Sequence, residues 1–189
     1  MIKTTEFKNS KVRYSDRGKG RIIVLLHGFL ESLEVWDEFS KKLSEHFRVI
    51  SIDLPGHGKT SCFGYIHTME LMAQCVKAVM DSITLRRYVV VGHSMGGYVA
   101  LAFAELFPQN VSGFCLFNST AFADSPEKKK DRDRSIEFVK KFPQQYGKEL
   151  VPKLFAPENL LSLKSEVEKI KSIACNTSKE GIVSALLGM

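Results

Sequence analysis

Ser94 is the residue of this chain with the clearest capacity for chemistry. It lies in the middle of Gly92-His93-Ser94-Met95-Gly96, directly after an apolar run that begins at Tyr88. A serine on a sharp turn from a strand into a helix has an exposed hydroxyl, and glycines two residues before and after it leave room for the turn. Such a hydroxyl can attack an acyl group or another activated carbonyl. The alternative is a plain strand–turn–helix junction with an incidental serine, which the flanking strand and helix patterns disfavour.

Attack on a carbonyl creates an oxyanion, which must be met by hydrogen-bond donors that are already in place. The backbone N–H of Met95 lies at the start of the helix after Ser94, where N–H groups have no partner within the helix. A second donor is expected from the loop after the apolar run Ile22–Leu26, where Phe29 is best placed to supply it. We therefore predict Ser94 as the nucleophile and the N–H groups of Phe29 and Met95 as an oxyanion hole.

A serine nucleophile also needs a base, and no histidine follows His93 in the sequence. His27 and His57 are expected at the same edge of the sheet as Ser94, but in loops where a structural role is more common. His93 is adjacent to Ser94, and neighbouring side chains on a tight turn point apart. The sequence therefore identifies a nucleophile without identifying its base.

Other polar residues receive structural interpretations. His46 and His67 are interpreted as surface or helix-edge residues. Asp53, at the end of a predicted strand, is expected to hold its loop. Asp124 follows the last predicted strand and is an alternative position for a catalytic acid, but it has no histidine to orient.

The elements that position these residues alternate between strands and helices. Strands are predicted at about 4–8, 11–15, 22–26, 47–53, 88–91 and 111–117, and helices at about 35–46, 68–83 and 95–107. This alternation predicts an α/β fold with a mostly parallel, doubly wound sheet covered by helices on both faces. From Ser125 onward only helices are predicted, at about 126–142, 147–155, 157–175 and 178–187. The loops after 26, 53 and 91 would meet at the edge where open α/β sheets bind ligands.

Composition describes an ordinary globular protein. With 189 residues, 44% of them hydrophobic and 25% charged, the chain can bury a core and is not expected to be disordered. The net charge of +6 is spread evenly, since residues 1–123 carry 14 basic and 11 acidic side chains and residues 124–189 carry 13 and 10. The run from Lys128 to Arg134 alternates in sign after its first three lysines and is interpreted as a solvated helix face, not as a nucleic-acid site.

The four cysteines show neither paired spacing nor metal-ligand spacing, and Cys75 and Cys115 fall in apolar patterns typical of small core residues. No apolar stretch approaches the length of a membrane span. We therefore expect a cytoplasmic protein that acts on a small-molecule substrate without a cofactor or metal, and that binds neither nucleic acid nor membrane. The sequence leaves the oligomeric state open.

Three segments in this order, 26–29 (Leu-His-Gly-Phe), 53–58 (Asp-Leu-Pro-Gly-His-Gly) and 92–97 (Gly-His-Ser-Met-Gly-Gly), resemble the α/β-hydrolase fold superfamily over about residues 12–123. The resemblance is greatest to its small esterases, C–C hydrolases and related lyases, including the menaquinone-pathway synthase. Ser94 disfavours the branches that use an aspartate nucleophile. The resemblance implies an α/β-hydrolase core in residues 1–122 and a helical cap in residues 123–189.

In that superfamily the acid and the histidine follow the nucleophile in the chain, beyond the cap. The resemblance therefore implies a truncated chain that lacks the last two strands, the acid and the histidine, and that is inactive or nearly so by itself. The function it implies is a serine hydrolase for a small ester, thioester or C–C substrate. Two alternatives remain open: a lyase or synthase in which Ser94 serves as the base, and a non-catalytic binding protein that has lost the triad.

Overall fold

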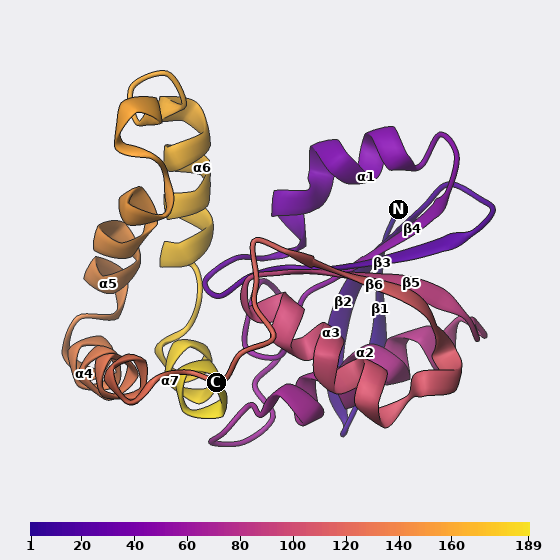
Figure 1. Ribbon diagram of the computed structural model, residues 1–189, viewed down its shortest axis with the longest axis horizontal. Coiled ribbons are helices and arrows are strands. Elements are labelled where there is room, and N and C mark those ends of the chain that lie inside the picture. Colours follow the sequence, from indigo (N-terminus) through magenta and orange to yellow (C-terminus); the bar gives the residue numbers. More distant parts are fainter.

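A sheet of six strands forms the centre of the structure, a computed structural model that describes residues 1–189 (Figure 1). The strand order is β1-β2-β4-β3-β5-β6. The hairpin of β1 (Ile2–Phe7) and β2 (Ser10–Arg17) pairs antiparallel with β4 (Arg48–Ile52). The remaining strands, β3 (Ile22–Leu26), β5 (Tyr88–His93) and β6 (Val111–Phe117), continue parallel to β4. The mostly parallel sheet predicted from the sequence is confirmed.

Helices cover both faces of this sheet, as predicted (Figure 1). The 3-10 helix η1 (Leu33–Trp36) and α1 (Asp37–Leu43) lie on one face, and α2 (Met69–Ser82) and α3 (Met95–Leu106) lie on the other. A short 3-10 helix, η2 (Pro108–Asn110), leads into β6. In the central strands, Val24 and Ile50 pack into the cluster beneath α2 and α3, whereas Leu25 and Val49 pack with Trp36. The side chains of adjacent residues thus pack into apolar clusters on opposite faces of the sheet, which explains why these strands are continuously apolar.

Residues 126–188 form a separate layer of helices (Figure 1). It consists of α4 (Pro126–Lys141), α5 (Pro143–Leu150), η3 (Val151–Leu154), η4 (Pro157–Asn159), α6 (Lys164–Cys175) and α7 (Lys179–Gly188). The helix predicted at 147–155 begins earlier, at Pro143, because a proline fits the first turn of a helix. The helix predicted at 157–175 is interrupted, and only its second part is α-helical.

This helical layer has an apolar cluster of its own but is joined to the sheet in two places. The cluster contains Val139, Val167 and Ile182 and extends to Leu30, which belongs to the loop after β3. In addition, α7 lies directly on the loop between β4 and α2, where the N–H of His67 donates to the carbonyl oxygen of Ser184 at 2.9 Å. The C-terminal helix is therefore part of the packing of the sheet as well as of the helical layer.

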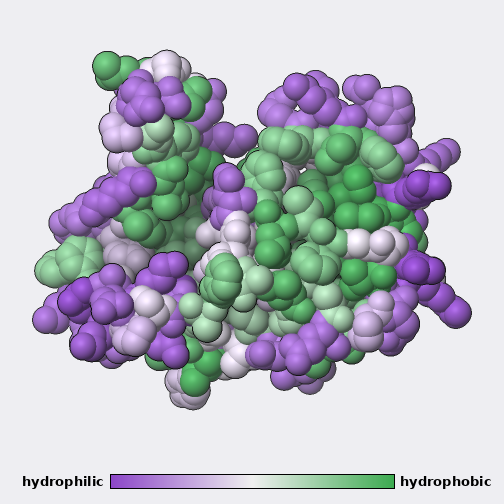
Figure 2. Space-filling model, in the orientation of Figure 1, coloured by the Kyte–Doolittle hydropathy of each residue, from purple (hydrophilic) through white to green (hydrophobic).

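The prediction that Cys115 is buried in the core is wrong, because this residue lies on the outer edge of the sheet. Cys115, expected in the core, is exposed, because β6 pairs only with β5 and lies at the edge. Phe114 and Phe117 on the same strand are 49% and 38% exposed. Figure 2 shows the apolar surface that covers this side of the sheet. No helix combines the length and the apolar character needed to cross a bilayer.

Candidate active site

Ser94 occupies the strained turn between β5 and α3. Its backbone has φ 49° and ψ −115°, in a region that residues with a side chain rarely adopt. The turn is tight enough that a Cβ atom on Gly92 would lie 2.1 Å from the carbonyl oxygen of Gly96, and one on Gly96 would lie 2.4 Å from that of Leu26. The glycines on either side of Ser94 are therefore required by close approach of the backbone.

Three hydrogen bonds fix the backbone of this turn. The N–H of Ser94 donates to the carbonyl oxygen of Phe117 at 3.1 Å, and its carbonyl oxygen accepts from the N–H of Gly97 at 2.9 Å and from Ser119 Oγ at 2.8 Å. The Ser94 residue itself is exposed, and its hydroxyl has no hydrogen-bond partner in the chain. The turn thus holds a free hydroxyl in a fixed position.

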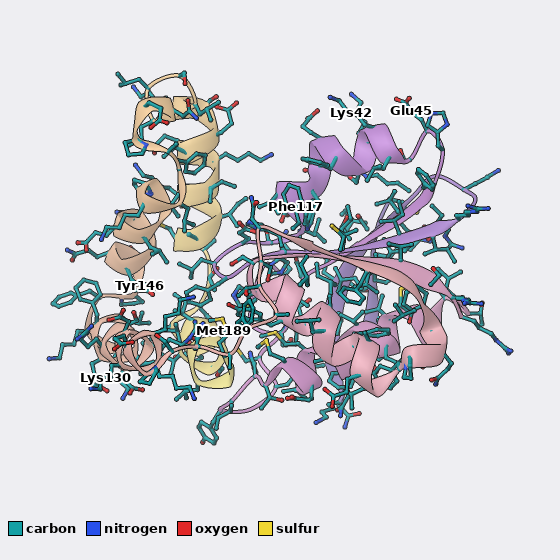
Figure 3. All side chains as sticks on the ribbon, in the orientation of Figure 1. Lys42, Glu45, Phe117, Lys130, Tyr146 and Met189 are labelled. Atoms are coloured by element: carbon teal, nitrogen blue, oxygen red, sulfur yellow. The ribbon has the colours of Figure 1, made fainter.

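A cavity of about 490 Å³ lies over Ser94, between the sheet and the helical layer. Figure 2 shows this side of the molecule hollowed between the two parts, and Figure 3 places Met189, one of the lining residues, where α7 meets the sheet. The other apolar lining residues come from both parts: Phe29, Met95, Leu150, Leu154, Phe155, Ile170. The polar ones are Glu31, His93, Tyr98, Asn118 and Arg132. The three residues predicted as the site, Phe29, Ser94 and Met95, therefore line one cavity.

The two predicted donors to an oxyanion are both available. The N–H of Phe29, in the loop after β3, donates to no acceptor in the chain. Met95 is the first residue of α3, so its N–H has no partner within the helix. The dipole of α3 also favours negative charge at this end.

None of the five histidines forms a hydrogen bond with Ser94. His27 is buried: its Nδ1 lies 2.8 Å from the carbonyl oxygen of Gly28, and its Nε2 accepts from the N–H of Leu54 at 2.9 Å. His57 is also buried, and burial together with the neighbouring His27 lowers its pKa to about 3. Both histidines therefore hold loops in their neutral form.

His67, expected at the surface or a helix edge, is fully buried. Its Nε2 accepts from the N–H of Phe63 at 3.0 Å, and burial lowers its pKa below the ordinary value. The sequence pattern missed this because the elements that cover His67 include α7, which lies more than a hundred residues later in the chain.

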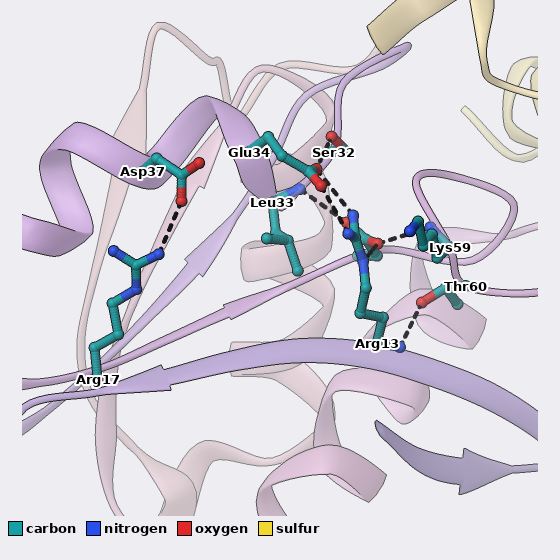
Figure 4. A network of polar contacts seen from close by, with 9 residues as sticks. Arg13, Arg17, Ser32, Leu33, Glu34, Asp37, Lys59 and Thr60 are labelled. Atoms are coloured by element: carbon teal, nitrogen blue, oxygen red, sulfur yellow. Dashed lines mark hydrogen bonds and ion pairs between the residues drawn. The ribbon is translucent and has the colours of Figure 1, made fainter. Parts of the chain in front are cut away.

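Asp53, expected from the sequence to hold its loop, makes its contacts in the polar network around Arg13, which Figure 4 shows. It is fully buried and accepts from Arg13 Nε at 2.5 Å and from the N–H groups of Leu33 and Lys59 at 2.8 Å each. Arg13 also donates to both carboxylate oxygens of Glu34. Asp53 thus ties together strand β2, the start of η1 and the loop after β4, and it does not line the cavity.

Two charged groups at the cavity were not singled out from the sequence. Arg132 lines it and pairs through Nε with Asp124 Oδ2 at 2.6 Å, so Asp124 is bound to a cation and not to a histidine. Glu31 lines it and contacts His93. Arg132 lies in a run of alternating charges that looks like any solvated helix face. Nothing in the sequence alone distinguishes it from Arg134, which is exposed.

Phe122, in the segment after β6, does not line the cavity and is 85% exposed.

Comparison with known proteins identifies the family of this chain. The family model described as alpha/beta hydrolase fold matches residues 21–171. The chain is 35% identical over 153 residues to the dihydrolipoyllysine-residue acetyltransferase component of the acetoin cleaving system of Cupriavidus necator, covering 80% of the chain and 40% of that protein. It is 36% identical over 114 residues to the 2-hydroxy-6-oxononadienedioate/2-hydroxy-6-oxononatrienedioate hydrolase of Paraburkholderia phymatum, covering 56% of the chain and 39% of that protein.

Among solved structures, a thermophilic esterase from Thermogutta terrifontis superimposes with a TM-score of 0.89 and 32% identity. The match covers 99% of this chain and 70% of the esterase. The chain thus spans less than half of the two curated relatives and about two thirds of the esterase.

Proposed function

This chain belongs to the α/β-hydrolase family, and we propose from that membership that it is a serine hydrolase acting on a small ester, thioester or C–C substrate. The observation that carries the proposal is the position of Ser94. Its free hydroxyl lies on a strained turn in the same cavity as two residues, Phe29 and Met95, whose N–H groups have no partner. This is the arrangement that acyl transfer requires of a nucleophile and an oxyanion hole.

In the proposed reaction Ser94 Oγ attacks the carbonyl carbon and forms a covalent intermediate. The carbonyl oxygen becomes an oxyanion, which accepts hydrogen bonds from the N–H groups of Phe29 and Met95. A single donor of this kind is typically worth about 10²–10³ in kcat. Collapse of this tetrahedral intermediate breaks the bond between the carbonyl carbon and the leaving group, which departs with a proton and leaves an acyl group on Ser94. Water then attacks the acyl carbon, which releases the carboxylic acid and returns a proton to Ser94 Oγ.

The reaction also needs a base to take the proton of Ser94 and return it to the leaving group. No histidine within residues 1–189 forms a hydrogen bond with Ser94, so we propose that a histidine and its acid are supplied from outside these residues. The family order of serine, acid and histidine supports this. Residues 1–189 by themselves are then expected to show little or no turnover.

We further propose that residues 123–189 act as a cap over a core formed by residues 1–122. The cavity over Ser94 supports this, because its wall combines Phe29 and Met95 from the core with Leu150, Phe155 and other residues of the helical layer. Its volume of about 490 Å³ and mostly apolar lining favour a small, largely apolar substrate. The names of the Thermogutta esterase and the Paraburkholderia hydrolase are consistent with an ester or a C–C bond as the target. The proposed reaction needs no metal or cofactor.

The test uses the complete product of the gene and a panel of p-nitrophenyl acetate, an acyl thioester and a vinylogous β-diketone. We expect hydrolysis of at least one of them, and a loss of about 10³-fold or more in Ser94→Ala. Labelling of Ser94 by a fluorophosphonate should follow the activity. Turnover that survives in Ser94→Ala would refute the assigned nucleophile.

The same experiment separates the two alternatives. A lyase or synthase would release an elimination or addition product without a labelled serine, which product analysis by mass spectrometry detects. A binding protein would retain a ligand in the cavity with no turnover by the complete gene product.

A further inference from the structure

One carboxylate oxygen connects the two loops that carry the proposed oxyanion hole. Glu31 Oε2 accepts a hydrogen bond from the N–H of Gly28 at 2.6 Å and lies 2.9 Å from Nδ1 of His93. Gly28 immediately precedes Phe29, and His93 immediately precedes Ser94. The contact therefore joins the residue before each functional group, across 62 positions of sequence.

The contact with Glu31 Oε2 determines which ring nitrogen of His93 carries the proton. A carboxylate oxygen can only accept, and Oε2 already accepts from Gly28, so the contact with His93 requires a proton on Nδ1. In the neutral ring the proton is then on Nδ1, and Nε2 is unprotonated. Glu31 thus imposes one tautomer on the histidine next to the nucleophile.

The surroundings leave both partners little freedom. Glu31 is buried, with 7% of its surface exposed, and a Cβ atom on Gly28 would lie only 2.9 Å from His93 Nδ1. The His93 ring packs against Trp36 and Phe117, with ring centres 6.4 and 5.9 Å away. A movement of the loop after β3 would therefore break the contact instead of carrying His93 with it.

We propose that Glu31 is a positioning residue for the proposed reaction, and that it sets the separation of the Phe29 and Met95 N–H groups by bridging Gly28 and His93. The inference rests on the proposed function. Its physical basis is that the two donors come from different loops, and a displacement of about 1 Å at a reacting centre can cost 10²-fold in rate. In this role the acceptor oxygen of Glu31 matters, and its charge does not.

Two variants of Glu31 distinguish the role of its acceptor oxygen from the role of its charge. In Glu31→Gln the amide oxygen can take the place of Oε2 and accept from both partners. In Glu31→Leu the volume is kept, but the N–H of Gly28 and Nδ1 of His93 lose their acceptor. Glu34→Gln serves as the matched control, because Glu34 lies three residues further on, pairs with Arg13 and does not line the cavity.

The first measurement is the tautomer of His93, by long-range ¹⁵N–¹H correlation spectroscopy of the complete protein. We expect a proton on Nδ1 in the wild type, in Glu31→Gln and in Glu34→Gln, and a proton on Nε2 in Glu31→Leu. A wild-type His93 that carries its proton on Nε2 alone would overturn the bridge, whatever the activity.

The second measurement is hydrolysis, with binding of a boronic acid that forms a tetrahedral adduct on Ser94. Glu31→Leu should lower kcat by about 10²-fold with KM changed by less than about threefold, and should weaken boronic acid binding in parallel. Glu31→Gln should retain most of the wild-type kcat and most of the boronic acid binding, and Glu34→Gln should change only the stability of the protein.

Equal losses of kcat in Glu31→Gln and Glu31→Leu, or no loss in either variant, would overturn the inference about Glu31 while leaving the protein a hydrolase. A wild type that neither turns over nor binds the boronic acid would refute the proposed function, and the role of Glu31 with it.

Discussion

The backbones of Gly56 and Gly181 are in direct contact: a Cβ atom on Gly181 would lie 2.1 Å from the carbonyl oxygen of Gly56. Gly56 belongs to the loop after β4, and Gly181 lies in the first turn of α7. This contact seats the C-terminal helix on the edge of the sheet that holds Ser94. A methyl group added at Gly181 would therefore push the C-terminal helix away from the loop after β4.

Gly181→Ala should therefore destabilise the protein, although alanine is the better helix former. Backbone cannot yield as a flexible side chain does, so we expect a loss of about 1–3 kcal/mol in the free energy of unfolding, within the range for overpacking. Urea denaturation monitored by Trp36 fluorescence measures it. The neighbouring exposed residue supplies the control, since Glu180→Ala should be nearly neutral. A Gly181→Ala variant as stable as Glu180→Ala would show that α7 is not seated in this way.

The buried network around Arg13 gives a second prediction (Figure 4). Asp53→Asn should cost about 3–5 kcal/mol, because it leaves the buried Arg13 without its closest carboxylate. The matched control is Asp37→Asn, which breaks the Arg17–Asp37 pair at 3.1 Å; both side chains of that pair are more than 30% exposed. An exposed pair contributes about 0–1 kcal/mol. Chemical denaturation of both variants at neutral pH makes the comparison, and similar losses would contradict the assignment of Asp53 as a structural anchor.

The strained turn at Ser94 allows a test that separates strain from chemistry. Ser94→Ala and Ser94→Gly both remove the hydroxyl, but only glycine adopts φ 49° without steric cost. Relief of about 1–3 kcal/mol of strain outweighs the extra backbone entropy of glycine, so Ser94→Gly should be more stable than Ser94→Ala by about 1 kcal/mol. Thermal unfolding of the pair measures the difference.

Ser82, at the end of α2, has an ordinary helical backbone and supplies the opposite expectation. There the glycine variant should be less stable than the alanine variant. If glycine were also the less stable variant at position 94, the turn would not be storing strain.

Features that depend on neighbouring residues in the sequence were predicted correctly, and features that depend on contacts between distant segments were missed. Ile22–Leu26 and Val111–Phe117 were predicted with the observed bounds, because an apolar run between turn residues is a local property. The position of β6 at the edge of the sheet is a property of the whole topology, and so Cys115 was misplaced in the core. Glu31 was missed for the same reason, because its partner His93 is brought to it only when β3 and β5 pair.

The exposed edge of β6 leads to a prediction about self-association. β6 pairs on one side only, and Phe114 on this strand is 49% exposed. Unprotected edges with apolar side chains promote pairing between molecules. We expect residues 1–189 to self-associate with rising concentration, and Phe114→Lys to reduce this, as measured by light scattering. Leu106→Lys, which removes an apolar side chain of similar exposure from α3, should have the smaller effect. A monomer at all concentrations would contradict the prediction.

The buried histidines should make the protein sensitive to mild acid. His57 takes up a proton near its ordinary pKa of 6.5 when unfolded, but burial lowers its pKa to about 3 in the folded protein. Because the unfolded state binds more protons between these values, the free energy of unfolding should fall as the pH decreases from 6.5 towards 3. Each such histidine contributes up to about 1.4 kcal/mol per pH unit, and burial lowers the pKa of His27 and His67 in the same direction.

Below pH 6.5, His57→Gln should therefore reduce the slope of unfolding free energy against pH by about 1.4 kcal/mol per pH unit, because one proton fewer is taken up on unfolding. Urea titrations at a series of pH values give the slope directly. Leu54→Ala provides the control: it removes a fully buried side chain from the same loop, and should lower stability by a similar amount at every pH. Parallel pH curves for His57→Gln and the wild type would mean that His57 is able to take up its proton in the folded protein, and that the loop around it opens to admit water.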